Sequence, residues 1–353
     1  MFETYQRWQR ELERQPVEFL GRRADDYLNA ARARLAAYVG ADPDELVFVP
    51  NATVGINLVA RSLPLQPGDE ILATDHEYGA MDYTWEFVCA RASARYRRQP
   101  LSVPVESAEA VVEELWSAVT PRTRAIFISH ITSPTALLLP VEAICRRARA
   151  AGIVTIIDGA HAPGQIPLDI GAFGPDFYAG NCHKWLCAPK GSGFLYARRE
   201  HHSWLEPLVI SWGWQPEASF VTRNQWQGTR DLAAFLAVPA AIDFQAAHDW
   251  EAIRTRCHQL ARAVRHRLAA LTCLEPIAPD SPAWFRQMVT APLPPCDVAA
   301  VQAWLYGQHR VEVPLITWNN RPYVRVSFQG YNTPDDLERL LTGLQDALRL
   351  YAL

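Results

Sequence analysis

The segment from Ala125 to Ile157 limits the possible folds of this chain more than any other. Ala125–Ile128 is a short apolar run that predicts a buried strand, and Ile153–Ile157 is a second one. Between them, Pro140 begins a stretch of helical character, which Gly152 ends. Two strands joined by a helix form a βαβ unit, in which the strands are parallel and the crossover is right-handed. We therefore expect an α/β fold around a mostly parallel sheet flanked by helices.

The rest of the chain adds further strands and helices to this unit. Strands are predicted at 46–49, 70–74, 94–98, 177–179 and 193–196, and helices at 2–39, 51–62, 81–92 and 107–119. The tail combines a helix at 249–270, a strand at 321–328 and a helix from Pro334, whereas 201–235 predicts long loops. A chain of 353 residues suggests two domains, at about 150 residues each. We expect a large domain at 20–240 and a smaller α+β domain at 241–353. Residues 1–19 are expected to belong to the smaller domain.

Composition and charge exclude several classes of protein. A net charge of −4 argues against a nucleic-acid binder. No apolar run approaches the ~20 residues of a membrane-spanning helix, and the first residues do not resemble a signal peptide. Seven scattered cysteines indicate reduced thiols in a cytoplasmic protein. The ten histidines show no metal-binding spacing, since His201 and His202 are adjacent, so we expect no metal site and no metal hydrolase.

Lysine is almost absent from this chain. Lys184 and Lys190 are its two lysines, and the other thirty-two of its 34 basic residues are arginine. A GC-rich genome explains the depletion, but not why both survivors lie in one loop. Arginine replaces lysine on most solvated faces but not where a primary amine must lose its proton. Both lysines are therefore candidate functional residues.

Three polar clusters follow predicted strands, where ligands bind in open α/β sheets. The start of the helix in Asn51–Gly55 offers backbone N–H groups to a phosphate, although the motif alone is better explained as a plain N-cap. Asp158–His161 places a carboxylate that could bind a protonated ring nitrogen or serve only as a cap. Asn181–Trp185 contains Lys184, whose amine would be desolvated by Trp185 and Leu186, or else simply solvated.

Two further segments carry polar groups that could meet an anion. Trp226–Asp231 is a polar turn that could meet a phosphate. Arg325 lies in an otherwise alternating strand, so it needs either an internal acid or a substrate carboxylate as its partner. Taken together, the lysine, the carboxylate, the phosphate cup and the arginine fit pyridoxal 5′-phosphate. That cofactor needs a Lys for its Schiff base and an Asp on its pyridinium nitrogen.

These segments resemble the class V aminotransferase family of fold-type I pyridoxal-phosphate enzymes, and within it the isopenicillin N epimerase-like branch. The resemblance rests on Asp158–Gln165, Gly180–Gly191 and Tyr323–Thr333, and it extends over nearly the whole chain. It implies that Lys184 forms the Schiff base and moves the Cα proton, that Asp158 pairs with the pyridine nitrogen, and that His161 lies near the phenolic oxygen. The large domain would then hold the cofactor.

The resemblance also implies how the cofactor and the substrate are held. The phosphate would be held by Ala52, Thr53, Asn181 and His183, and by Gly228 and Thr229 of the neighbouring subunit in a homodimer with shared active sites. Tyr78 would stack on the ring, with His76 as the alternative, and Arg325 would bind the carboxylate of an amino-acid-like substrate.

Two departures from the family pattern affect the expected chemistry. Cysteine desulfurases of this class carry a nucleophilic Cys in the loop that corresponds to 309–316, and here the nearest cysteine is Cys296, so we expect no persulfide chemistry. Family members also begin with an Asn-x-Gly turn that lines the pocket. This chain begins after it at Met1–Glu3, which implies an open pocket or a misassigned start.

The reaction expected first is epimerisation at Cα through a quinonoid. A C–S lyase or an aminotransferase is the alternative, because both share that first step. A catalytically inactive relative that still binds the cofactor is a further alternative.

Overall fold

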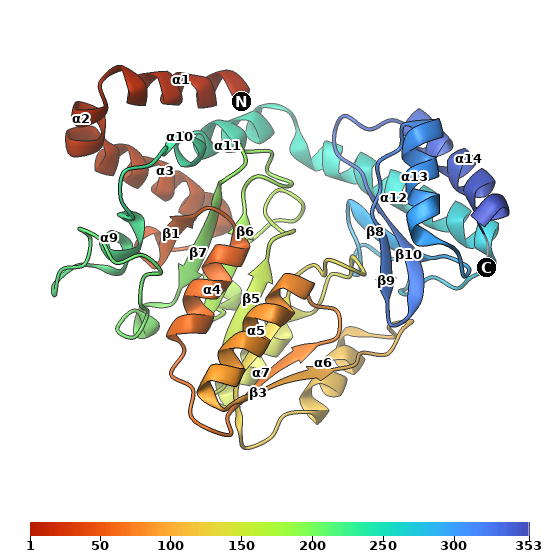
Figure 1. The fold of residues 1–353 in the computed structure, drawn as a ribbon, viewed down its shortest axis with the longest axis horizontal. Helices are drawn as coiled ribbons and strands as arrows, with labels where there is room; N and C mark the ends of the chain where they lie inside the picture. The colour runs from red at the N-terminus through yellow and green to blue at the C-terminus, as the bar shows by residue number, and fades with distance from the viewer. Residues whose placement is uncertain (352) are drawn as a thin grey trace. The chain divides into compact units, whose positions relative to one another are not determined.

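The strands of this protein form two separate sheets. The computed structural model describes residues 1–351 and 353, and within them one sheet has seven strands and the other three (Figure 1). The strand order of the large sheet is β1-β7-β6-β5-β4-β2-β3, and β3, β2, β4, β5 and β6 are mutually parallel. The strand β7 pairs antiparallel with both of its neighbours, β1 and β6. The small sheet, in the order β8-β10-β9, is antiparallel. The expected α/β fold with a mostly parallel sheet is confirmed.

The elements have the following bounds. The strands are β1 Leu46–Val49, β2 Glu70–Thr74, β3 Arg95–Gln99, β4 Thr123–Ser129, β5 Val154–Gly159, β6 Phe177–Asn181, β7 Gly193–Ala197, β8 Met288–Pro292, β9 Leu315–Trp318 and β10 Arg321–Ser327. The α-helices are α1 Phe2–Arg14, α2 Pro16–Glu18, α3 Ala24–Val39, α4 Ala52–Ser62, α5 Gly79–Ala92, α6 Ala108–Ser117, α7 Val141–Ala150, α8 Ile170–Phe173, α9 Phe220–Gln225, α10 Ala233–Leu236, α11 Val238–Ala247, α12 Trp250–Thr272, α13 Val298–His309 and α14 Pro334–Tyr351. A π-helical turn, η1 Phe19–Arg23, and two 3₁₀ turns, η2 Pro43–Glu45 and η3 Arg199–His201, complete the set.

The βαβ unit forms as the sequence predicts. It consists of β4, α7 and β5, and its strands pair in parallel register from Ala125 with Val154 to Ser129 with Asp158. Asp158 therefore belongs to β5 instead of following it. The helix expected at 2–39 is interrupted between α1 and α3. The long loop expected at 201–235 contains α9 and α10, and β8 and β9 were not predicted.

The chain divides into two compact units. Unit 1 comprises Met1–Gln99, Leu115–Ile131 and Pro140–His248, and it contains the large sheet. Unit 2 comprises Pro100–Glu114, Thr132–Leu139 and Asp249–Leu353, and it contains the small sheet. The domain boundary expected between residues 240 and 241 stays a prediction. The units differ from it, because residues 1–19 lie in unit 1 and two short segments before residue 140 lie in unit 2.

Unit 1 is built around the buried face of the large sheet. The helix α4 packs against β5, β6 and β7, and α7 packs against β4 and β5 (Figure 1). All residues of β6 and β7 are buried, as expected for central strands covered on both faces. Among the described residues, no helix has the length and the apolar character needed to cross a bilayer.

Candidate functional site

The three polar clusters predicted from the sequence lie at one edge of the large sheet. The parallel register places Ser129 opposite Asp158, and Gly159 opposite Gly180, so the carboxyl ends of β4, β5 and β6 lie side by side. Asn181 ends β6. This edge is where open α/β sheets bind ligands.

Lys184 and His161 meet at this edge. The Lys184 Nζ lies 3.1 Å from the His161 Nε2, and the Trp185 indole N–H donates to the His161 Nδ1 at 3.2 Å. Because an indole nitrogen can only donate, the Nδ1 carries no hydrogen, and a neutral His161 carries its hydrogen on Nε2, facing Lys184. Lys184 itself is exposed although Trp185 and Leu186 are buried. The expectation that these neighbours desolvate the amine is therefore not met.

The turn that carries His161 packs directly against the lysine loop. Gly164 has a φ of +89°, and a Cβ there would lie 2.4 Å from the backbone of Trp185 and Leu186. The Gln165 side chain donates to the His161 carbonyl at 2.8 Å, and the Gln245 side chain donates to the Trp185 carbonyl at 3.1 Å. The close approach at Gly164 thus joins the two loops, while the first hydrogen bond braces the turn of His161 and the second ties the lysine loop to α11.

Gly164→Ala should therefore lower the free energy of unfolding by about 3 kcal/mol, because both the backbone conformation and the space exclude a side chain. Gly152→Ala is the matched control. Its φ is also positive, at +69°, but no atom lies within 4 Å of the added carbon, so we expect a loss of about 1 kcal/mol. Urea denaturation measures both, and equal losses would show that loop packing is not the cause.

Asp158 is the buried carboxylate of the site. It is 5% exposed, and its Oδ1 accepts from the Ala160 N–H at 2.9 Å. Burial raises its pKa above the ordinary value, and the Ala160 N–H and the positive charge of Lys184 counteract part of that rise. A cation arriving beside this carboxylate would stabilise its charged form.

The N-terminus of α4 is closed by two side chains and leaves one amide open. The Asn51 Oδ1 caps the Val54 N–H at 2.9 Å, and the Asn181 Oδ1 accepts from the Ala52 N–H at 2.8 Å. The Thr53 N–H has no hydrogen-bond partner among the described residues. Of the two backbone amides expected to bind the phosphate, that of Thr53 is open, whereas that of Ala52 already donates to Asn181.

His183 points its two ring nitrogens in different directions. Its Nδ1 donates to the Ser192 carbonyl at 2.7 Å, which leaves Nε2 for another partner. Burial lowers the pKa of His183, and the Ser192 carbonyl offsets part of this. His183 is therefore neutral at neutral pH, with its hydrogen on Nδ1 and an acceptor at Nε2, and an anion beside Nε2 would favour its protonation to a donor.

Two candidates for stacking on a ring lie in the loop between β2 and α5. Tyr78 is 45% exposed at the start of α5, whereas His76 is fully buried. Tyr78 is therefore the one whose ring face is open to a ligand.

Two predicted groups of site residues belong to other elements of the chain. Gly228 and Thr229 are in the turn between α9 and α10, where Gly228 has a φ of +92°. Their expected role needs a second subunit and stays a prediction. Arg325 lies on β10 in unit 2.

Arg325 is a half-buried cation without an acidic partner. Its Nη1 donates to the Ser133 carbonyl at 2.5 Å and to the Ser133 Oγ at 3.1 Å. Its Nε is buried without a hydrogen bond, and no carboxylate of the described residues pairs with it. Burial lowers its pKa. Of the two partners considered from the sequence, an internal acid is thus absent from the described residues, and an external anion fits.

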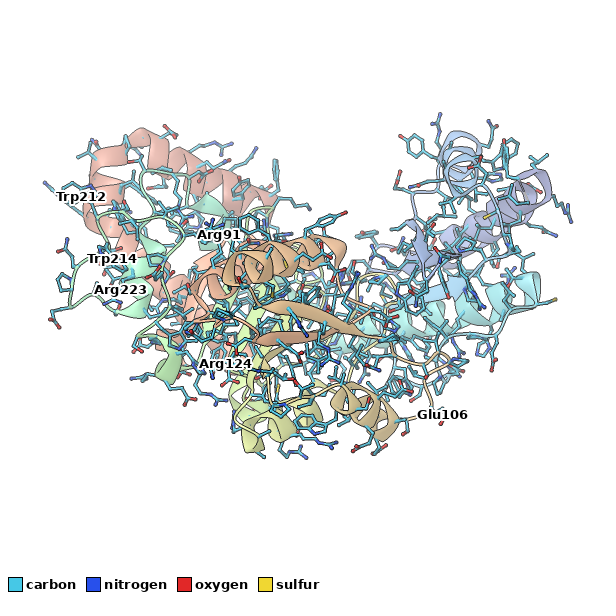
Figure 2. All side chains as sticks on the ribbon, turned by 60° about the horizontal axis from the view of Figure 1, so that its bottom comes forward. Arg91, Glu106, Arg124, Trp212, Trp214 and Arg223 are labelled. Carbon is cyan, nitrogen blue, oxygen red and sulfur yellow. The ribbon has the colours of Figure 1, made fainter. Side chains whose placement is uncertain are left out.

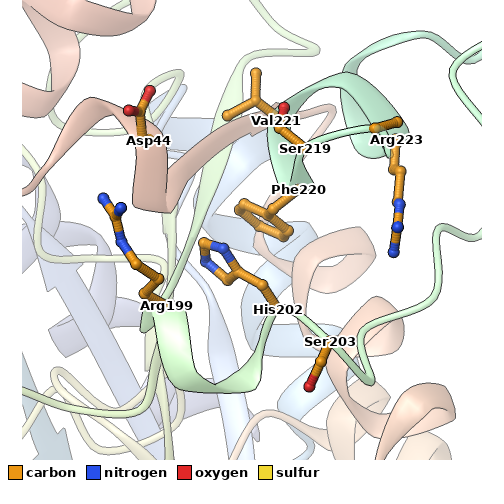
Figure 3. A pocket seen from close by; sticks show the side chains of 9 residues that line it. Asp44, Arg199, His202, Ser203, Ser219, Phe220, Val221 and Arg223 are labelled. Carbon is orange, nitrogen blue, oxygen red and sulfur yellow. The ribbon is translucent and has the colours of Figure 1, made fainter. Parts of the chain in front are cut away.

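A separate pocket in unit 1 is lined by none of these residues. It has a volume of about 410 Å³, and the His202 and Phe220 rings stack inside it with centroids 4.3 Å apart (Figure 3). Its lining residues are Asp44, Arg199, His202, Ser203, Ala218, Ser219, Phe220, Val221 and Arg223. None of them was predicted as a site residue, and the charged side chains of Asp44 and Arg199 are exposed.

One group of potential metal ligands occurs among the described residues. Donor atoms of Asp176, Glu200 and His201 lie within 4.8 Å of one another. The Arg198 Nη1 lies 3.3 Å from the Asp176 Oδ1 and 3.5 Å from the Glu200 Oε1. A guanidinium already supplies the positive charge that these carboxylates need, so the group is an ion-pair network.

Sequence reasoning missed two residues of this region. Glu77 is buried between the ends of β2 and β4, and its only sequence signal was its place between two predicted stacking residues. Ser133 binds Arg325 across 192 positions of the sequence. No local pattern signals such a contact.

Comparison with known sequences gives matches along most of the chain. The family model described as aminotransferase class-V matches residues 1–340. The isopenicillin N epimerase of Amycolatopsis lactamdurans is 40% identical, over 94% of this chain and 87% of that protein. The enzyme of the same name from Streptomyces clavuligerus is 38% identical, over 98% and 91%. A putative L-cysteine desulfhydrase of Oryza sativa is 31% identical, over 96% and 78%.

Solved structures share the fold at low sequence identity. The cystine C-S lyase C-DES, in complex with its product cysteine persulfide, superposes with a TM-score of 0.86 at 22% identity, over 98% of this chain and 93% of that chain. The cysteine desulfurase CsdA of Escherichia coli gives 0.76 at 23% identity, over 94% and 86%.

Proposed function

The chain belongs to the aminotransferase class-V family, and from this premise we propose that it is an epimerase acting at the Cα of an amino-acid-like substrate. Its cofactor is pyridoxal 5′-phosphate. The observation that carries the proposal is the 40% identity to an isopenicillin N epimerase over 94% of the chain. The family model, which matches residues 1–340, spans the segments that carry Lys184, His161 and Asp158.

The residues at the sheet edge fit this cofactor. The buried Asp158 needs a cation, and the open Thr53 N–H at the start of the 11-residue α4 suits a phosphate. When bound, the cofactor draws electrons away from the Cα of the joined amino acid and so weakens its Cα–H bond. We assign Asp158 to the ring nitrogen, Tyr78 to the ring face and Thr53, Asn181 and His183 to the phosphate.

Lys184 is the proposed base at Cα. Its amine would hold the cofactor and, when a substrate amine takes that place, would be free to take the Cα proton. The His161 Nε2, 3.1 Å away, faces the lone pair of the unprotonated amine. Trp185 keeps that tautomer by donating to Nδ1. The amine therefore has an orienting partner in His161.

A direct test follows isopenicillin N and L-cysteine in deuterium oxide, with the cofactor-loaded protein. An epimerase inverts the configuration of isopenicillin N and incorporates one deuterium at the inverted carbon. Chiral chromatography and mass spectrometry detect both changes. Release of sulfide from L-cysteine, without inversion of isopenicillin N, would instead establish the second candidate, a C–S lyase. That candidate is supported by the 31% identity to a putative L-cysteine desulfhydrase. No conversion of either substrate would favour an inactive relative.

Arg325 is the proposed carboxylate ligand. Arg325→Met should raise KM about 10- to 100-fold, because a hydrogen bond to a charged group contributes about 1.5–3 kcal/mol. Steady-state kinetics with the amino acid and with its carboxamide measure this, and the carboxamide should not distinguish the variant from wild type. Arg321→Met, an exposed arginine on the same strand, is the control and should change KM less than about twofold. A fall in kcat at constant KM would contradict the assignment.

We also propose a homodimer with shared sites. The loop after β7 exposes apolar side chains, among them Trp212, which is 82% exposed, and Trp214, over which the Arg223 guanidinium lies at 5.4 Å (Figure 2). Exposed aromatic residues in such numbers are typical of an interface. A second copy on this surface would be the source of Gly228 and Thr229 for the phosphate. The unpatterned cysteines support a cytoplasmic location.

A further inference from the structure

Glu77 is a buried acid in the loop that connects β2 to α5. Its Oε1 lies 2.6 Å from the Thr74 Oγ1 at the end of β2. Its Oε2 accepts from the Ser129 N–H at 2.9 Å and lies 2.6 Å from the Ser129 Oγ at the end of β4. One carboxyl group therefore links two neighbouring parallel strands.

No positive charge compensates this carboxyl group. Among the described residues no basic side chain pairs with Glu77. The titratable groups that face it are Asp158 from β5 and the Tyr96 phenol from β3, and its hydrogen-bond partners are two hydroxyls and one backbone N–H. Burial, with the charge of Asp158 in addition, raises the pKa of Glu77 to about 8. A buried carboxyl group without a cation keeps its proton, because the charged form would lose its hydration.

The position of Glu77 joins two parts of the site. Its neighbours His76 and Tyr78 are the candidates for stacking on the cofactor ring. Its partner Ser129 lies opposite Asp158 in the β4–β5 register, and the next residue, His130, donates its N–H to the Asp158 carbonyl at 2.9 Å. Glu77 thus connects the stacking loop to the strand end next to the carboxylate for the ring nitrogen.

We propose that Glu77 is a positioning residue whose uncharged carboxyl ties the loop 75–78 to the end of β4 and leaves Asp158 as the single charged carboxylate facing the cofactor ring. The inference rests on the proposed function, because it assumes that the ring lies between Tyr78 and Asp158. Two properties follow from it. The hydrogen bonds of Glu77 matter for cofactor binding, and its charge does not.

The first measurement is the dissociation constant of pyridoxal 5′-phosphate, from the change in Trp fluorescence of the apoprotein. Glu77→Gln keeps the size and the hydrogen-bonding capacity of the neutral acid, so we expect a change below about threefold. Glu77→Leu removes the hydrogen bonds, and we expect binding about 10- to 100-fold weaker, as for other residues that orient a site.

The second measurement is thermal unfolding of the apoprotein between pH 5 and pH 9, which needs neither cofactor nor activity. Since the pKa of Glu77 is raised on folding, its stabilising contribution is present below its ordinary pKa and is lost as the pH rises towards 8. Glu77→Gln has no such loss. The Tm of this variant relative to wild type should therefore rise by about 5 °C between pH 5 and pH 9.

Glu70→Gln is the matched control at the opposite end of β2. Burial works to raise the pKa of Glu70, but hydrogen bonds from Thr120 and Arg97 bring it below its ordinary value. This variant should lose stability above the ordinary pKa of a glutamate and keep the wild-type cofactor affinity. Between pH 5 and pH 9 its Tm difference from wild type should therefore stay constant, whereas that of Glu77→Gln changes.

Three results would overturn the proposal. These are wild-type cofactor affinity in Glu77→Leu, equal loss of affinity in Glu77→Gln and Glu77→Leu, and a Tm difference for Glu77→Gln that does not change with pH. If Glu77→Leu does not fold, the Glu77→Gln measurements still decide. If the wild-type protein itself does not bind the cofactor, the proposed function fails, and the unfolding experiment separately tests whether Glu77 is uncharged.

Discussion

Lys184→Ala is expected to lower turnover at least about a thousandfold and to abolish the visible absorbance of the lysine-bound cofactor. The reason is that both depend on a primary amine at this point of the sheet edge, next to the His161 Nε2 at 3.1 Å. Alanine has no amine, and Lys190 is the one other lysine side chain in the sequence that could supply one. Absorbance spectra of the purified protein with added pyridoxal 5′-phosphate, together with a turnover assay, measure the two effects.

The scarcity of lysine makes the control for this experiment unusually clean. Lys190 is the other lysine of the chain, it is exposed, and it lies six positions further along the same loop region. Lys190→Ala should keep the absorbance band and most of the turnover. An unchanged band in Lys184→Ala, or its loss in Lys190→Ala, would contradict the assignment of Lys184.

Asp158→Asn is expected to lower kcat about 100- to 1,000-fold while the protein still folds. Asparagine keeps the size of the side chain and its acceptor for the Ala160 N–H. It cannot carry the negative charge that would keep the ring nitrogen of the cofactor protonated. The cofactor then draws electrons from Cα less strongly, and the proton on Cα is harder to remove. Steady-state kinetics and the cofactor dissociation constant measure the separate effects on turnover and on binding.

Asp176→Asn provides the comparison for this second prediction. Asp176 is also a buried aspartate of unit 1, but it binds Thr155 and His201 at the other end of the neighbouring strands. This variant should lose stability and keep the kcat of the folded fraction. If Asp158→Asn kept more than about half of the wild-type kcat, a charge at the ring nitrogen would not be needed, and the assignment would be wrong.

The elements that could be predicted have local signals. The unit β4-α7-β5 is marked by two apolar runs, by Pro140 at the start of its helix and by Gly152 after it, and all of these act within one or two turns of chain. The strands β8 and β9 have no such marks. Met288–Pro292 and Leu315–Trp318 become strands because they pair with β10, and that pairing is a non-local contact.

The candidate site shows the same division. Asp158, Lys184 and the start of α4 could be proposed because each follows a predicted strand, and the parallel order of those strands brings their carboxyl ends together. The contacts within the site could not be proposed. They depend on side chains from segments far apart in the sequence, such as the Asn181 amide on the Ala52 N–H or Glu77 on Ser129.

The sequence by itself determined the α/β class, the family and the amine on which the chemistry depends, because apolar periodicity, turn residues and short motifs are properties of neighbouring residues. Only the tertiary structure decided that the Ala52 amide is already bound, that Lys184 stays exposed beside His161, and that Glu77 is buried without a cation. The physical reason is that hydrogen bonding, burial and charge compensation are set by the groups that folding brings within a few ångströms, whatever their separation along the chain.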